Sequence, residues 1–304
     1  MGLINNLLHG KKIMNENASD SKLLIEVTES QKRLIKQNLM MLLKDVDTVC
    51  KKYQITYMLV YGSALGAIRH HGFIPWDDDL DISMPRKDYN KFVEVFNAEL
   101  GDKYILNAST YSNKAKTRFP KILIKGTHFR EVLDSQDKEL QTLYMDIFIL
   151  ENIPDNTFVR ITKGICCNVL EFITGQVLLF ENRDTVVKSV YCMAGKSNYY
   201  ARVIIGFVFS FFSSNNWSKL LDSIIQYDNE NTKYCGLPTG RKHYFGDYFV
   251  RESVLPPSEA LFEGMIVPVF NDPHKCLTEL YGDYMKIPPE NERERHFVRE
   301  IDLG

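Results

Sequence analysis

Hydrophobic residues recur along the first half of the chain with two different periods. Between Glu29 and Lys52 they return every three or four residues, which predicts an amphipathic helix, and the segment 86–100 repeats this spacing. Short runs rich in β-branched and aromatic residues predict strands at 55–61, 79–84, 104–106, 121–124 and 144–150. Strands and helices therefore alternate through residue 150, which is typical of an α/β fold.

The same pattern divides the chain into four regions. Residues 1–28 are largely polar and predict a flexible leader, and residues 29–154 form the alternating core. Residues 155–230 are rich in Ile, Val, Phe and Leu and predict a hydrophobic insertion of two or three helices. Residues 231–304 return to short elements separated by Gly and Pro, and we expect them to complete the core domain.

Composition and charge exclude several classes of protein. The 304 residues carry a net charge of −2, so we expect no nucleic-acid partner. Six cysteines without a CxxC pair indicate neither a zinc ribbon nor a disulfide framework, and we expect a reducing, cytoplasmic location without a secretory signal. The longest apolar run, 203–212, is about half of the roughly 20 residues that a membrane-spanning helix needs, so none is predicted.

The stretch YGSALGAIRHHGFIPWDDDLDIS contains the strongest chemical signal in the chain. In its acidic cluster, Asp77 to Asp81, the strand period places Asp79 and Asp81 on one face. Two carboxylates this close repel each other by about 4 kcal/mol at an effective dielectric constant of 20, which favours a cation between them. Mg²⁺, or Mn²⁺, is the natural candidate, because carboxylates and substrate phosphates supply its oxygen ligands.

Two further features extend this candidate site. Gly62 and Ser63 follow a predicted strand, where a glycine allows a phosphate to approach the backbone and N–H and hydroxyl groups donate to it. Asp146 lies within the apolar strand YMDIFIL, where a lone charge needs a metal or a partner. The alternatives are a solvated acidic turn for the cluster and a buried, hydrogen-bonded structural role for Asp146.

The segment GSALGAIRHHGFIPWDDDLDISMPRKDY closely resembles the signature of the LicD family, which includes bacterial phosphocholine transferases and the fukutin-type proteins of animals. The resemblance continues at RFPKI, at MDIFIL, where this chain has Ile149 in place of the family's usual Pro, and at LFEGMIVPVFNDPHKCLTELYGDYMKIPP. It implies a nucleotidyltransferase-like mixed sheet flanked by helices, an α/β (α+β) fold here interrupted by the hydrophobic helical insertion.

The resemblance also implies a reaction: metal-dependent transfer of a phospho-alcohol, with phosphocholine as the leading candidate, from a CDP-linked alcohol donor. The acceptor would be a hydroxyl of a glycan or lipid-linked glycan, such as lipopolysaccharide, teichoic acid or capsule. Carried over residue by residue, Gly62 and Ser63 would hold donor phosphate, while Asp79, Asp81 and Asp146 would bind the metal. Asp146 is also the candidate general base, and we expect Arg69 and Lys121 to neutralise the transferred phosphate.

Other interpretations remain open at this point. The same acidic pair would serve a nucleotidylyltransferase that moves NMP from an NTP, and a non-catalytic glycan-binding module could keep the fold. Arg69 can instead be read as an arginine at a helix end that binds carbonyl groups. Lys121 has the alternative of a strand lysine whose ammonium simply extends to solvent. The hydrophobic insertion fits either packing on the core or, given its scattered basic residues, peripheral contact with the inner face of the cell membrane.

Overall fold

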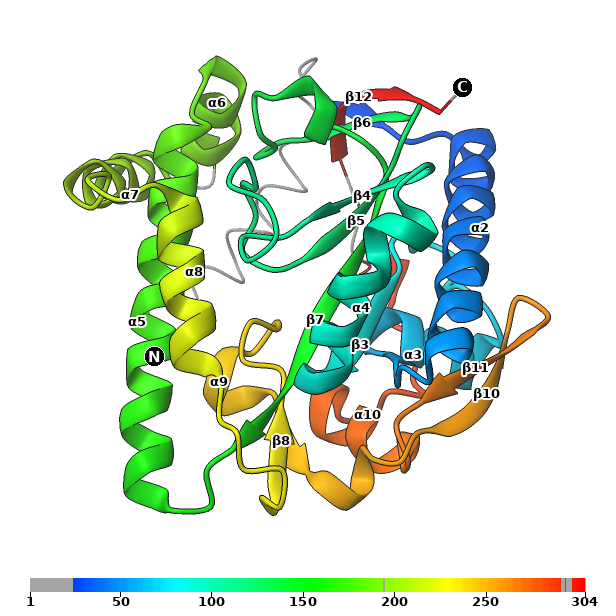
Figure 1. Cartoon of the computed structure of the whole chain (residues 1–304). Coiled ribbons are helices and arrows are strands. Elements are labelled where there is room, and N and C mark those ends of the chain that lie inside the picture. The colour runs from blue at the N-terminus through cyan, green and yellow to red at the C-terminus, as the bar shows by residue number, and fades with distance from the viewer. Residues whose placement is uncertain (1–23, 194, 291–292, 294–296, 304) are drawn as a thin grey trace.

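A seven-stranded mixed sheet forms the centre of the computed structural model, which describes residues 24–193, 195–290, 293 and 297–303 (Figure 1). Five strands follow the order β2–β3–β7–β5–β4, and β8 joins the end of β7 and pairs with β9. β3 and β7 run parallel, whereas the other neighbours are antiparallel. The strands are β2 (Met58–Leu59), β3 (Asp81–Pro85), β4 (Tyr104–Asn107), β5 (Lys121–Ile124), β7 (Tyr144–Ile153), β8 (Tyr234–Gly236) and β9 (Tyr248–Val250).

Helices cover this sheet, which confirms the predicted fold class. They are α2 (Glu29–Tyr53), α3 (Tyr61–His70), α4 (Arg86–Leu100), α5 (Thr157–Glu181), α6 (Thr185–Met193), α7 (Lys196–Val208), α8 (Ser214–Ile225), α9 (His243–Gly246) and α10 (Pro273–Tyr281). The hydrophobic insertion contains four helices, α5 to α8, rather than the two or three predicted. The break before α6 is easily missed in the sequence because it has no Pro or Gly: Asp184 simply accepts the Val187 N–H at 2.8 Å.

Two smaller sheets flank the central one. β1 (Ile25–Glu26), β12 (Phe297–Asp302) and β6 (His128–Glu131) form one, and the hairpin β10 (Ser258–Phe262) and β11 (Met265–Val269) forms the other. Two short 3₁₀ turns are η1 (Lys138–Leu140) and η2 (Arg251–Ser253). Because β1 pairs with β12, the leader predicted over residues 1–28 extends too far, and its residues 1–23 lie outside the described residues.

Both predicted long helices are confirmed, and the caps of α2 explain its limits. Thr28 and Gln31 form a reciprocal capping box at its start, and Gln54 ends it in the left-handed conformation. The apolar face between them buries Ile35, Leu39 and Val46 in the main hydrophobic core. α4 follows β3 directly and contributes Phe92 and Phe96 to the same core.

Two boundaries near the acidic cluster differ from the prediction. The strand predicted at 55–61 is confined to Met58–Leu59, because the chain turns into α3 at Tyr61, which adopts a positive φ of 48°. Gly62 and Ser63 therefore belong to the first turn of a helix rather than to a loop. β3 begins at Asp81, so Asp79 lies just before the strand and the alternation argument does not apply to it.

A buried charge cluster fastens the helical insertion to the sheet. Arg86, the first residue of α4, donates through Nε to Glu151 of β7 at 2.9 Å and through Nη2 to Asp222 of α8 at 2.8 Å. Glu151 is 2% exposed. Burial raises the pKa of Glu151, and the Arg86 guanidinium opposes this effect. The cluster thus holds α8 against the edge where β7 ends.

Replacement of Arg86 tests how much this cluster contributes. Arg86→Met is expected to lower the free energy of unfolding by about 3–5 kcal/mol, because it leaves a buried carboxylate without its cation. Lys87→Met is the matched control, since the adjacent lysine is exposed and meets Glu230 only at 3.8 Å; we expect a change within about 0.5 kcal/mol. Equal urea-unfolding midpoints for the two variants would show that the cluster is dispensable.

Candidate functional site

Strand register brings three of the predicted site residues side by side. Asp81 of β3 is the register partner of Asp146 on β7, and Lys121 of β5 is the partner of Asp146 on its other side. Register partners share one face of a sheet, and Lys121 Nζ lies 3.3 Å from Asp146 Oδ1. Asp146, the lone acid that was predicted to need a partner, therefore has one in Lys121. Asp81, Asp146 and Lys121 form a row across the three neighbouring strands β3, β7 and β5.

Neighbouring negative charges disfavour the ionisation of Asp81 and of Asp146. Burial raises the pKa of Asp81 well above its ordinary value, and the negative charges of Asp79, Asp146 and Asp77 raise it further. Burial likewise raises the pKa of Asp146 to about 6, although Lys121 acts in the opposite direction. Asp146 Oδ1 is buried, and the Lys121 ammonium at 3.3 Å lies beside it. Additional positive charge is therefore needed if Asp79, Asp81 and Asp146 are all to be ionised.

These carboxylates fit an incomplete cation site. Among the described residues, no three His, Cys, Asp or Glu side chains lie together so that they could hold a metal ion. Mg²⁺ commonly takes only one or two carboxylates from the protein and completes its shell with water and substrate phosphates. The charges of Asp79 and Asp146 raise the pKa of Asp81, so these carboxylates lie near one another and one or two of them would be available as ligands.

The first turn of α3 lies against this acidic group. The Ser63 Oγ accepts a hydrogen bond from the Asp81 N–H at 2.8 Å, which ties the helix start to the start of β3. A Cβ on Gly62 would lie 2.8 Å from Asp77 Oδ2, so only glycine fits there without displacement. The first N–H groups of a helix have no intrahelical acceptor and favour anions. The start of α3 and the acidic group therefore lie next to each other.

The two predicted phosphate-binding cations occupy different positions. Lys121 lies beside Asp146, with its ammonium 3.3 Å from the centre of the Tyr144 ring. Burial lowers the pKa of Lys121, but Asp146, Glu131 and Asp134 outweigh this effect and raise it. The lysine is thus charged and already surrounded by carboxylates.

Arg69 lies near the other end of α3, about 10 Å along the helix axis from Gly62. Its Nη1 donates to the Tyr284 carbonyl at 2.6 Å, and its guanidinium lies 5.9 Å from the Trp76 ring centre. The structure therefore does not bring Arg69 to the carboxylates. In its present position it fastens the C-terminal region to α3.

A buried tyrosine adds a group that the sequence did not indicate. The Tyr61 hydroxyl donates to Asp247 Oδ2 at 3.0 Å. Burial and the charge of Asp247 raise the pKa of Tyr61, and Asp81 also contributes. Asp247 is held in place by the Lys242 N–H at 2.7 Å. Since the two residues are 186 positions apart, no local pattern could have predicted this contact.

A histidine of the C-terminal region forms a second unpredicted pair. His243 Nδ1 lies 2.7 Å from Oε2 of Glu171, a carboxylate of α5 that is 4% exposed. The hydrogen bond to Glu171 raises the pKa of His243. Arg118 approaches the same carboxylate at 4.0 Å, and His243 influences the ionisation of Asp247. The insertion thus supplies polar groups to the side of the site that carries Tyr61.

Asp81→Asn tests the electrostatic description in the absence of metal. Because the folded pKa of Asp81 lies above its unfolded value, ionisation costs stability as pH rises above about 4, and no cost remains below that pH. In chelating buffer, Asp81→Asn should therefore unfold at a higher temperature than wild type at pH 8, and the gain should shrink toward pH 4.

Asp102→Asn serves as the control for this measurement, because Asp102 is exposed and should leave the unfolding temperature unchanged. A lower unfolding temperature for Asp81→Asn at every pH would contradict the description, since the carboxylate would then stabilise the metal-free protein.

Comparison with known proteins supports the resemblance seen in the sequence. The family model for the LicD/FKTN/FKRP nucleotidyltransferase domain matches residues 54–162, a range that contains all seven predicted site residues. The lipopolysaccharide cholinephosphotransferase LicD of Haemophilus influenzae is 28% identical over 267 residues, which cover 83% of this chain and 90% of that protein. Uncharacterized proteins of Rickettsia typhi and Rickettsia prowazekii are 41% and 45% identical over 58 and 51 residues, 19% of each protein. The resemblance inferred from the sequence is thereby confirmed: residues 54–162 match the model of the LicD/FKTN/FKRP nucleotidyltransferase domain, and most of the chain is similar to a LicD protein.

Proposed function

We propose that the protein transfers phosphocholine, in a metal-dependent reaction, from a CDP-linked donor to a hydroxyl of a cell-surface glycan such as lipopolysaccharide. The observation that carries this proposal is the contact between Ser63 and Asp81, which joins a phosphate-binding helix start to a cation-binding acidic group. The similarity to the Haemophilus influenzae enzyme along 90% of that protein supports phosphocholine and lipopolysaccharide as the specific choices.

Each residue has a defined task in this reaction. The N–H groups of Gly62 and Ser63 bind donor phosphate, and Asp79, Asp81 and Asp146 hold Mg²⁺ or Mn²⁺. A cation bound there would supply positive charge to the transferred phosphate. Asp146 accepts the proton of the acceptor hydroxyl, whose oxygen forms a bond to the choline-bearing phosphorus. The bond from that phosphorus to CMP breaks, so the products are CMP and the phosphocholine-substituted glycan.

Lys121 acts on this reaction through Asp146. At 3.3 Å from Asp146 Oδ1, its ammonium favours the ionised carboxylate and fixes its orientation. Arg69, which binds the Tyr284 carbonyl, keeps the C-terminal region against α3 and has no direct contact with the reacting phosphate in this proposal. We place the reaction in the cytoplasm, an assignment supported by six cysteines that are all free.

Product analysis tests the proposed function. Full-length protein with CDP-choline, Mg²⁺ and lipopolysaccharide lacking phosphocholine should release CMP in equal amount to the phosphocholine found on the glycan. Pyrophosphate released from an NTP instead would indicate a nucleotidylyltransferase. Glycan binding without turnover of CDP-choline, CDP-ribitol or CDP-glycerol would indicate a non-catalytic module.

Gly62→Ala tests the role of the helix start. The new methyl group would meet Asp77 Oδ2 at 2.8 Å and crowd the phosphate position, so kcat/KM should fall about tenfold or more while the fold persists. Gly175→Ala is the matched control, because this helical glycine of α5 has open space around its Cβ and should keep wild-type activity. Equal activity of both variants would remove Gly62 from the phosphate site.

A further inference from the structure

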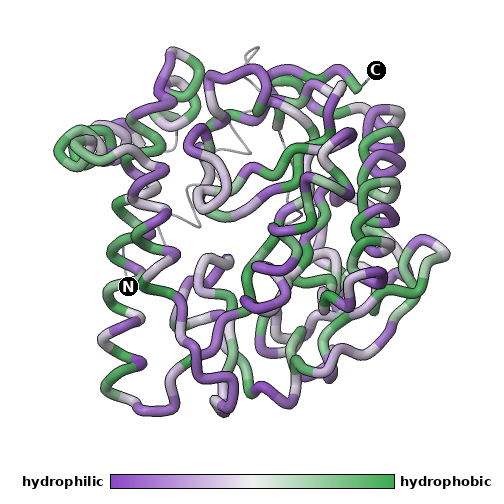
Figure 2. The backbone as a smooth tube through the Cα atoms, in the orientation of Figure 1, coloured by the Kyte–Doolittle hydropathy of each residue, from purple (hydrophilic) through white to green (hydrophobic). Residues whose placement is uncertain are grey.

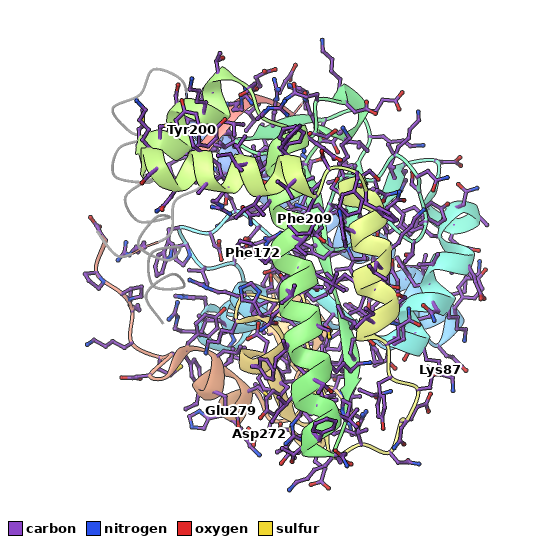
Figure 3. The ribbon with its side chains drawn as sticks, turned by 90° about the vertical axis from the view of Figure 1, so that its left-hand side faces the viewer. Lys87, Phe172, Tyr200, Phe209, Asp272 and Glu279 are labelled. Atoms are coloured by element: carbon purple, nitrogen blue, oxygen red, sulfur yellow. The ribbon has the colours of Figure 1, made fainter. Side chains whose placement is uncertain are left out.

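The helical insertion turns an extended apolar face to the outside. On α5, exposed side chains follow each other at steps of three or four residues: Phe158, Ile161, Ile165, Val169 and Phe172, with exposed fractions of 76%, 46%, 53%, 51% and 44%. Beyond Tyr200 on α7, the chain exposes Ile204, Phe207 and Phe211 at 60%, 64% and 70%. Figure 3 looks onto this face, where α7 crosses α5 close to Phe172, and Figure 2 shows α7 as largely hydrophobic. We call these residues the apolar face.

The opposite side of α5 belongs to the interior of the protein. Cys167 and Leu179 are buried, Glu171 binds His243, and a Cβ on Gly164 would collide with Tyr244 and Phe245. Among the described residues, α5 is the one helix whose length and composition would allow it to cross a membrane, a test that a buried core helix also passes. However, 56% of its most apolar window is buried in the protein, so α5 has only one side to offer to lipid.

Basic groups accompany the apolar face. The helices α5, α6 and α7 together contain five basic and two acidic side chains, in a chain whose net charge is −2. Three of the basic side chains, Arg160, Lys163 and Arg202, donate to Pro154, Gln226 and Gln176 within the protein. Both acids have partners: Glu171 is buried beside His243, and Glu181 accepts from the Ser214 hydroxyl at 2.5 Å. Near the end of the face, Lys188 and Lys196 line a surface hollow together with Thr185, Ser189 and Tyr200. Lys188 Nζ lies 5.8 Å from the Tyr200 ring centre.

We propose that the apolar face lies on an anionic lipid bilayer, with Lys188 and Lys196 on headgroup phosphates. Exposed aromatic and aliphatic side chains on one side of a helix, flanked by lysines, are the features of an interfacial helix. A second copy of the chain is the less favoured occupant, because a two-fold contact through this face would bring its basic groups toward each other. Docking in this way would set a lipid-linked acceptor beside α5, whose inner side holds Glu171 and His243. The membrane contact itself does not depend on the proposed reaction.

Co-sedimentation of full-length protein with vesicles tests this proposal. Wild type should pellet with vesicles of equal parts phosphatidylcholine and phosphatidylglycerol, and markedly less with phosphatidylcholine alone. The double variant Phe207→Ser, Phe211→Ser should bind the mixed vesicles at least tenfold more weakly, because two exposed rings no longer enter the lipid. Lys188→Gln with Lys196→Gln should weaken binding about tenfold on the mixed vesicles only.

Matched controls separate the face from general hydrophobicity and charge. Ile266 of β11 is 53% exposed on the other side of the molecule (Figure 1), so Ile266→Ser should bind like wild type. Lys44→Gln with Lys91→Gln, on α2 and α4, controls for the loss of two charges. Asp81→Asn should also bind normally, which keeps this test independent of catalysis, and circular dichroism verifies that each variant is folded.

Two outcomes would overturn the proposal. One is failure of folded wild type to pellet with either vesicle. The other is a wild-type dimer in analytical ultracentrifugation that becomes monomeric in the Phe207→Ser, Phe211→Ser variant, with no vesicle binding, which would make the face an interface between copies.

Discussion

Repulsion between buried carboxylates is the constraint around which this domain is arranged. Asp81 and Asp146 are held as register partners on parallel strands, with Asp79 close enough to influence both. In a hydrophobic sheet such an arrangement costs free energy unless positive charge is supplied. Lys121 supplies part of it at 3.3 Å. The positive charge that is still missing is the physical reason to expect a bound cation. A cation held by so few protein ligands in turn favours a substrate that carries phosphates.

Several segments of the fold surround these carboxylates and form the candidate site with them. The bend at Tyr61 ends β2 early and starts α3 where its first N–H groups lie next to β3, and the Ser63 hydroxyl joins the two elements. The C-terminal region closes the same area through the hydrogen bond from Tyr61 to Asp247. The insertion adds Glu171, which holds His243. Segments far apart in the sequence thus surround the acidic group. The opposite side of α5 carries the apolar face, which we propose contacts lipid.

Much of this arrangement could be predicted from local sequence, and the remainder could not for identifiable reasons. Periodicity was sufficient for α2 and α4, whose apolar faces pack on the core, and the spacing of Gly62, Ser63 and the acidic cluster was sufficient to select the site. The partner of Asp146 depends on register across β5 and β7, which periodicity does not fix. Arg69 matched the family pattern, yet three-dimensional packing places it on the Tyr284 carbonyl.

The central claim is that donor phosphate and metal bind together at Asp81 and the start of α3. Calorimetric titration of CDP-choline into the full-length protein tests it most directly, with and without Mg²⁺, in wild type and in Asp81→Asn. The account predicts heat of binding in wild type only when Mg²⁺ is present, and its loss in Asp81→Asn. Binding of equal strength without Mg²⁺, or unchanged binding in Asp81→Asn, would contradict it.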